Sequence, residues 1–237
     1  MKIILAGSTG FIGDAVLQRC LAHPQISSIV ALSRRELSVT HPKLQTIIMT
    51  DFLHYTPEIL AQLEGAAACF WALGSRLAGR EVHVDYTLAA VDAFAAHLAM
   101  KVGKRGRFCF VYLSGAMTEK DQKKSLWLLS DTRKMRGGIE TALADFERAQ
   151  AGMWESVVVR PSYVTQGESA VLIYAVPTWY IPVSELAAAV VDVLIAGNVR
   201  MYMENVELRE RGKTALLTLP RWRPEPSLDA YGVRIYT

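Results

Sequence analysis

Three glycines at the start of the chain are spaced as in a loop that binds phosphate groups. The run Gly7-Ser8-Thr9-Gly10-Phe11-Ile12-Gly13 follows a short apolar segment and precedes a helical pattern. A backbone without Cβ atoms can approach a pyrophosphate closely, and the first N–H groups of the helix then bind the anion. This strand–turn–helix context predicts a dinucleotide site, and a structural turn that binds nothing is the alternative.

The residues after the second expected strand indicate which dinucleotide is preferred. A carboxylate about twenty residues beyond the glycines usually holds the ribose 2′-hydroxyl of NAD. Here the chain reads Ser33-Arg34-Arg35, and the first carboxylate is Glu36. A guanidinium can bind a 2′-phosphate through paired hydrogen bonds. We therefore predict NADP(H), with Arg34 as the phosphate ligand and Ser33 as an additional donor. Two solvent-exposed arginines without a ligand are the alternative.

Two further pairs of residues follow later strands and are candidates for cofactor contacts. Asp51 and Phe52 follow the third expected strand, where the Asp51 side chain could meet the adenine amino group. An Asp after a strand is also a common turn residue. Leu73 and Gly74 end the fourth strand, where a small residue lets the backbone lie against the cofactor.

Apolar runs alternate with helical patterns, and these elements must position the candidate residues. The runs are continuous, as in strands buried on both faces, and the alternation predicts an α/β Rossmann-type doubly wound parallel sheet. We expect residues 1–213 to form an NADP(H)-binding domain with a substrate-side segment at 161–185, and 214–237 to form a surface tail. The expected strands are 2–6, 28–32, 44–49, 67–72, 107–113 and 156–159, and the expected helices are 11–23, 82–100, 138–149 and 184–196.

Composition limits the classes of partner. The chain has 237 residues, of which 51% are hydrophobic, so it can bury a large core, and its net charge of +3 is too small for a dense nucleic-acid-binding face. Cys20, Cys69 and Cys109 form no C-x-x-C pair, so we expect buried thiols and no metal site. No apolar segment is long enough for a signal peptide core or a membrane span. We expect a soluble, cytoplasmic protein that binds a small molecule and neither nucleic acid nor membrane.

Together these segments resemble the short-chain dehydrogenase/reductase superfamily, in its extended and atypical branches. They are most similar to the Tat-interacting-protein-type NAD(P)-binding proteins. The resemblance implies a Rossmann fold, NADP(H) binding with Pro161 near the cofactor, and a small-molecule substrate over the nicotinamide. It rests on the glycine run, Asp51-Phe52, Ala72-Leu73-Gly74-Ser75-Arg76, Tyr112-Leu113-Ser114 and Val159-Arg160-Pro161-Ser162.

The chain departs from this family at the catalytic residues. The family uses a serine together with a Tyr-x-x-x-Lys pair, whose tyrosine transfers a proton and whose lysine holds the nicotinamide ribose. Ser114 matches the serine, but the tyrosine and lysine positions fall on Thr132 and Arg136, or in another register on Ser130 and Lys134. A threonine hydroxyl is a far poorer acid than a phenol with a pKa of about 10.

Glycines make the placement of these residues uncertain from sequence alone. Gly137-Gly138 disfavour a helix, so a helix that starts only after them would leave Thr132 and Arg136 in a loop. Tyr163 belongs to an aromatic segment after the sixth strand that forms either a substrate wall or a small core under a loop. Tyr86, Tyr163, Ser114 or a water are the other candidate proton donors.

Three functions fit this sequence. The first is an NADPH-dependent reductase of a small carbonyl or enone compound, with Ser114, Thr132, Arg136 and Tyr163 as candidate catalytic residues. The second is a non-redox isomerase, cyclase or dehydratase on the same scaffold. The third is a non-catalytic protein that senses the cofactor and binds a partner. The alanine-rich helix over 82–100 could also pack against a second copy as a homodimer.

Overall fold

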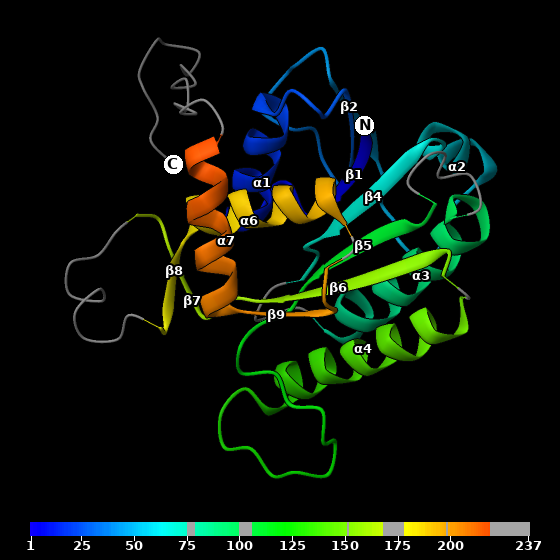
Figure 1. Cartoon of the computed structure of the whole chain (residues 1–237). Coiled ribbons are helices and arrows are strands. Elements are labelled where there is room, and N and C mark those ends of the chain that lie inside the picture. Colours follow the sequence, from blue (N-terminus) through cyan, green and yellow to red (C-terminus); the bar gives the residue numbers. More distant parts are fainter. Residues whose placement is uncertain (75–78, 100–105, 151, 168–177, 198, 219–237) are drawn as a thin grey trace.

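A seven-stranded parallel β-sheet forms the middle layer of the protein, in the order β3-β2-β1-β4-β5-β6-β9 (Figure 1). The computed structural model describes residues 1–74, 79–99, 106–150, 152–167, 178–197 and 199–218. The strand order reverses between β1 and β4, as in a doubly wound fold, which confirms the expected Rossmann-type α/β class. The strands are β1 (Lys2–Ala6), β2 (Ser28–Ser33), β3 (Leu44–Ile48), β4 (Ala66–Trp71), β5 (Phe108–Leu113), β6 (Trp154–Arg160) and β9 (Tyr202–Glu204).

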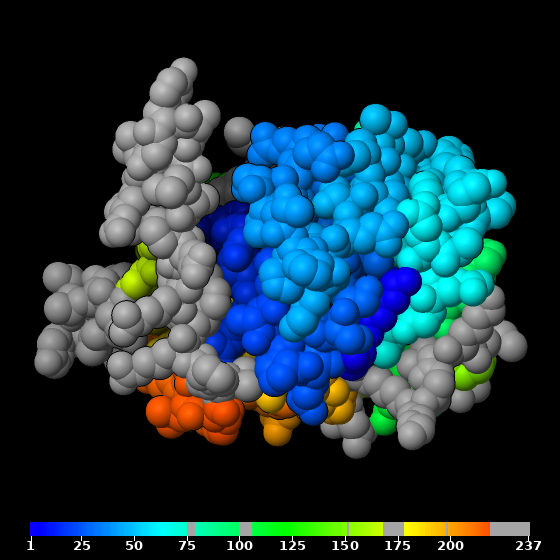
Figure 2. All heavy atoms as spheres, turned by 90° about the horizontal axis from the view of Figure 1, so that it is seen from above, coloured from blue at the N-terminus to red at the C-terminus, as the bar shows by residue number. Residues whose placement is uncertain are grey.

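Helices cover both faces of the sheet, because side chains alternate between the two faces along each buried strand. Ile3 and Leu5 of β1 pack on the face covered by α1 (Phe11–Ala22), α6 (Val183–Ala196) and α7 (Asn205–Thr218). Ile4 and Ala6 pack on the opposite face, with α2 (Pro57–Leu63), α3 (Tyr86–His97) and α4 (Ser130–Ala149). The first part of the chain, coloured blue to cyan, makes up much of the face seen in Figure 2.

Several elements differ from the sequence-based expectations. Helix α4 begins at Ser130, eight residues before the expected start at 138. The expected helix over 82–100 is divided into a π-helical turn, η1 (Glu81–Asp85), and α3. The expected boundary at Thr214 falls inside α7, which continues to Thr218, and 219–237 lie outside the described residues. A second sheet of two short strands, β7 (Tyr163–Thr165) and β8 (Tyr180–Pro182), was not expected.

Candidate functional site

The glycine loop joins β1 to α1, and its backbone is packed so closely at Gly7 and Gly13 that neither position has room for a side chain. Gly7 has a φ of +89°, and a Cβ at this position would lie 2.6 Å from the Ala72 carbonyl oxygen at the end of β4. A Cβ at Gly13 would lie 2.0 Å from the Gly7 carbonyl oxygen. Gly10 is the extended N-cap of α1, so the loop turns directly into the first helical N–H groups.

The loop fits the phosphates of a dinucleotide. The Ser8 hydroxyl oxygen is buried and has no hydrogen-bond partner within the described residues. An unpaired buried polar atom costs about 1–3 kcal/mol, so it points to a group that the protein does not itself supply. Thr9, Gly10 and Phe11 are exposed beside it, whereas Ile12 packs on the core. The expected loop residues therefore form one cradle at the N-terminus of α1.

The candidate residues for the adenosine end lie beyond β2 and β3. Ser33 is buried, and its hydroxyl oxygen accepts the Arg35 N–H at 3.3 Å, while Arg34 is exposed. Desolvation raises the pKa of Tyr86, Glu81 and Asp51 add to the increase, and Arg34 opposes it.

Asp51 is engaged in the local turn. Its carboxylate accepts the Leu53 N–H at 2.7 Å and pairs with His54 Nδ1, also at 2.7 Å. Phe52 is buried, and its ring centroid lies 5.6 Å from that of Tyr86. The structure therefore displays the turn role of Asp51, and its contact with adenine remains a prediction.

At the end of β4 the chain bends sharply. Gly74 has a φ of +129°, and a Cβ there would lie 2.6 Å from the His83 ring of η1, so the position requires glycine. Leu73 is half-buried beside it. Ser75 and Arg76, which carry part of the family resemblance, lie outside the described residues.

Two of the catalytic candidates, Ser114 and Arg136, meet at the carboxyl end of β5. Ser114 directly follows this strand, and its N–H donates to the Val159 carbonyl of β6 at 2.9 Å. Arg136 Nη1 lies 3.4 Å from the Ser114 carbonyl oxygen, whereas the backbone carbonyl of Lys134 accepts Gln122 Nε2 at 3.1 Å. Arg136, from the Thr132/Arg136 register, therefore reaches the end of β5. Thr132 lies one turn before Arg136 on α4, so both are helical and not in a loop.

A buried carboxylate that sequence reasoning missed lies next to Ser114. The Ser114 hydroxyl donates to Glu140 Oε1 at 2.6 Å, and the Glu140 side chain is fully buried. Arg160 Nε donates to the same oxygen at 3.0 Å, Arg160 Nη2 pairs with Oε2, and Lys120 Nζ lies 3.9 Å from Oε2. The available signal was position, because Glu140 lies between the buried residues Ile139 and Leu143 on α4.

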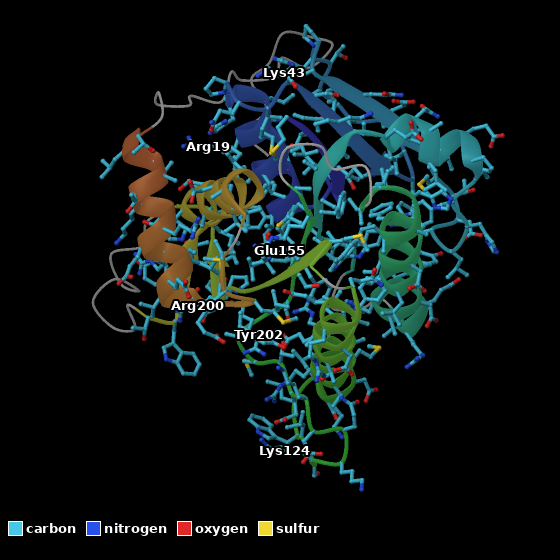
Figure 3. The ribbon with its side chains drawn as sticks, turned by 45° about the vertical axis from the view of Figure 1, so that its right-hand side comes forward. Arg19, Lys43, Lys124, Glu155, Arg200 and Tyr202 are labelled. Atoms are coloured by element: carbon cyan, nitrogen blue, oxygen red, sulfur yellow. The ribbon has the colours of Figure 1, made fainter. Side chains whose placement is uncertain are left out.

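One aromatic ring packs against the cations of this cluster, and a second lies buried near it in β5. Tyr202 of β9 has Lys120 Nζ 4.0 Å and Arg160 Cζ 4.6 Å from its ring centroid, and Figure 3 shows Tyr202 next to α4. Tyr112 is a buried phenol two residues before Ser114. Burial raises the pKa of Tyr112, while Arg136 opposes the increase. The phenol that shares the environment of Arg136 is therefore part of the core.

The aromatic segment after β6 has an exposed tyrosine, Tyr163, whereas Ser114 is buried. Pro161 is buried, and its carbonyl accepts the Ala116 N–H at 3.0 Å, which joins the loops after β5 and β6. Tyr163 is 62% exposed and starts β7, where its N–H donates to the Trp179 carbonyl at 3.0 Å. In the described part of the chain no hydrogen bond joins Tyr163 to Ser114.

The described residues contain no group of three or more His, Cys, Asp and Glu side chains that could hold a metal ion. Cys20, Cys69 and Cys109 are buried thiols that form no disulfide. Among the helices of the described ranges, none has both the length and the apolar character needed to cross a membrane.

Solved structures identify the fold. A short-chain dehydrogenase from Burkholderia cenocepacia in complex with NADP superposes with a TM-score of 0.64 at 15% identity, over 91% of this chain and 92% of that one. The chain has the fold of the short-chain dehydrogenases/reductases. Uronate dehydrogenase from Agrobacterium tumefaciens gives a TM-score of 0.60 at 14% identity, over 96% of this chain and 92% of the other.

Sequence comparison finds relatives that match only in part. No protein-family profile matches the chain. Leucinostatins biosynthesis cluster protein T of Purpureocillium lilacinum is 34% identical over 122 residues, which are 48% of this chain and 42% of that protein. The mitochondrial protein fmp52-2 of Aspergillus oryzae is 27% identical over 167 residues, 68% of this chain and 66% of that protein. The chain thus spans less than two thirds of the length of these relatives.

Proposed function

We propose that the protein is an NADP(H)-dependent oxidoreductase that acts on a small carbonyl or enone compound. The observation that carries this proposal is the glycine cradle with its orphaned Ser8 hydroxyl, located where the strand order reverses between β1 and β4. Arg34 directly follows β2, and the first carboxylate after this strand is Glu36. Neighbours of the same fold are dehydrogenases and reductases, and one of them holds NADP.

Each candidate residue then has a role toward the cofactor. The loop from Gly7 to Gly13 would hold the pyrophosphate, and Arg34 with Ser33 would hold the 2′-phosphate. Arg136 would hold the nicotinamide ribose in place of the family lysine, because its guanidinium lies at the end of β5. Asp51, Phe52, Leu73, Gly74 and Pro161 would line the remaining cofactor surface.

When bound, NADPH supplies a hydride, and the protein must position the substrate and provide a proton. Thr132 occupies the position of the family tyrosine, but its hydroxyl is a poor acid. Ser114 lies beside Arg136 at the same strand end, and Tyr163 is exposed on β7. We therefore assign substrate contacts to Ser114, Thr132 and Tyr163, with Arg136 as the strongest hydrogen-bond donor near the substrate.

A second candidate function is a non-catalytic protein that senses NADP(H) and binds a partner. Two observations favour it: Ser114 is only 3% exposed, and its hydroxyl is already bonded to Glu140. The cytoplasmic location is a proposal, because two relatives carry the word mitochondrial in their names. The homodimer is a proposal as well. Cell fractionation and sedimentation velocity would test them.

The test is a fluorescence titration of the purified protein with NADPH and with NADH, followed by assays of NADPH consumption with a panel of carbonyl and enone compounds. Preference for NADPH together with turnover supports the oxidoreductase. Binding of NADPH without turnover across the panel favours the cofactor sensor. Absence of binding to both nucleotides overturns both functions.

A further inference from the structure

The hydrogen bonds of Ser114 can be counted atom by atom. A serine hydroxyl has one proton to donate and two lone pairs that accept. Ser114 Oγ lies 2.6 Å from Glu140 Oε1 and 3.0 Å from Thr118 Oγ1. The Thr118 hydroxyl donates its own proton to the Gly115 carbonyl at 2.7 Å. Thr118 and Glu140 are then two possible acceptors for the one Ser114 proton, and the charged carboxylate, which lies at the shorter distance, takes it.

Glu140 is a charged acceptor, because two cations, Arg160 and Lys120, balance the negative charge of its buried carboxylate. Arg160 donates to both of its oxygens, and Lys120 lies 3.9 Å from Oε2. The hydrogen bond to Glu140 raises the pKa of the Arg160 guanidinium above its ordinary value. A hydroxyl that donates to a charged acceptor forms a stronger bond than one that donates to a neutral carbonyl. A substrate carbonyl would have to compete with this carboxylate for the Ser114 proton.

We propose that Ser114 meets its substrate only as a hydrogen-bond acceptor, and that Glu140 is the positioning residue that sets this polarity. The substrate atom at the end of β5 is then an O–H or N–H group. Within the proposed function, on which this inference rests, the substrate is a carbonyl or enone compound that also carries a hydroxyl, amine or amide N–H. Its carbonyl oxygen needs another donor, and Arg136 lies at the same strand end.

The influence of Glu140 on the group at position 114 can be measured without substrate or cofactor by placing a thiol there. In Ser114→Cys the thiol takes the position of the hydroxyl, and the three natural cysteines are buried with 0% exposure. The pKa of the new thiol is read from the ultraviolet absorbance of its thiolate, with the wild-type titration subtracted. Because the Glu140 charge opposes a thiolate, Ser114→Cys/Glu140→Gln should have a thiol pKa lower by about one unit or more.

Controls separate this effect from general changes in charge. Ser114→Cys/Glu204→Gln removes Glu204, the exposed partner of Arg160. Glu204 does not contact Ser114, so this variant should change the thiol pKa far less than Glu140→Gln does. Ser114→Cys/Glu140→Asp withdraws the carboxylate by one methylene and should give an intermediate value, which provides a reading if the Gln variant does not fold. Equal thiol pKa values with Glu, Asp and Gln at position 140 would overturn the proposal.

Ligands provide a second reading. Among small molecules found to bind the NADPH complex, those weakened about tenfold or more by Ser114→Ala should carry an O–H or N–H group. A plain ketone weakened to that extent would overturn the proposal. Failure of the protein to bind NADP(H) would remove the proposed function and leave the thiol titration interpretable, so the two failures are distinguishable.

Discussion

The backbone of Gly137 lies against the carbonyl of Glu119, so closely that a Cβ at position 137 would stand 1.8 Å from that oxygen. The Glu119 N–H also donates to the Arg133 carbonyl at 3.1 Å, which ties the loop after β5 to the first turns of α4. This contact explains why a glycine lies within the helix. It also fixes the helical segment that brings Arg136 to Ser114.

Alanine at the two adjacent glycines of α4 should have opposite effects. Gly137→Ala should lower the free energy of unfolding by about 3 kcal/mol or more, because the added methyl group would force the neighbouring backbone to move. Gly138→Ala should raise it by about 0.5–1 kcal/mol, because that position is exposed, helical and has nothing within 4 Å of an added Cβ. Urea unfolding of both variants checks this, and equal effects would contradict the packing argument.

Loss of Glu140 should destabilise the protein far more than loss of Glu204, although both carboxylates bind Arg160. Glu140 is fully buried, so Glu140→Ala leaves part of the Arg160 charge unpaired in the interior and should cost about 3–5 kcal/mol. The Glu204 side chain is 56% exposed, and Glu204→Ala should cost about 1 kcal/mol or less. Thermal and urea unfolding measure both, and a mild Glu140→Ala variant would show that the pair contributes little.

Replacement of Arg34 should reduce the preference for NADPH over NADH. If Arg34 binds the 2′-phosphate, Arg34→Ala loses charge-assisted hydrogen bonds of about 1.5–3 kcal/mol, or roughly tenfold to hundredfold in NADPH affinity. Affinity for NADH should stay the same, because it has no 2′-phosphate. Arg35→Ala, at the adjacent exposed position, is the matched control. Fluorescence titration of both variants gives the answer, and a larger loss in Arg35→Ala would transfer the role to that residue.

Stability should fall on mild acidification because of His23. Burial lowers the pKa of His23 below its ordinary value, and Arg19 and Lys43 add to the decrease. In the unfolded chain the ring takes up a proton below a pH of about 6.5, whereas the folded protein resists it. The His23 contribution to the free energy of unfolding is therefore unaffected above that pH and decreases below it.

The measurement compares urea unfolding from about pH 7.5 to about pH 5.5. His23→Gln should show a flatter dependence than the wild type over this window. His97→Gln, at an exposed position of α3, should follow the wild type. Parallel curves for wild type and His23→Gln would contradict the prediction.

Local patterns were sufficient for six strands of the parallel sheet and for the glycine loop between β1 and α1. Continuous apolar runs predicted six of the seven strands of the main sheet, because each buried strand is apolar over its own length. The glycine run predicted the loop at the N-terminus of α1, because turn geometry and helix start are encoded within a few residues. β9, three residues long, is too short for such a pattern to appear.

The centre of the candidate site was decided by contacts between residues distant in the chain. Only the fold places Glu140, 26 residues beyond Ser114, within 2.6 Å of its hydroxyl, with Arg160 on the other side. The start of α4 was mispredicted because glycine has a low helix propensity. In the folded protein Gly137 is needed within the helix, because only a residue without a Cβ can pack against the Glu119 backbone. Helix propensity and residue spacing carry information over about one turn of helix. Which of two side chains donates a hydrogen bond to the other depends on contacts between residues far apart in the chain.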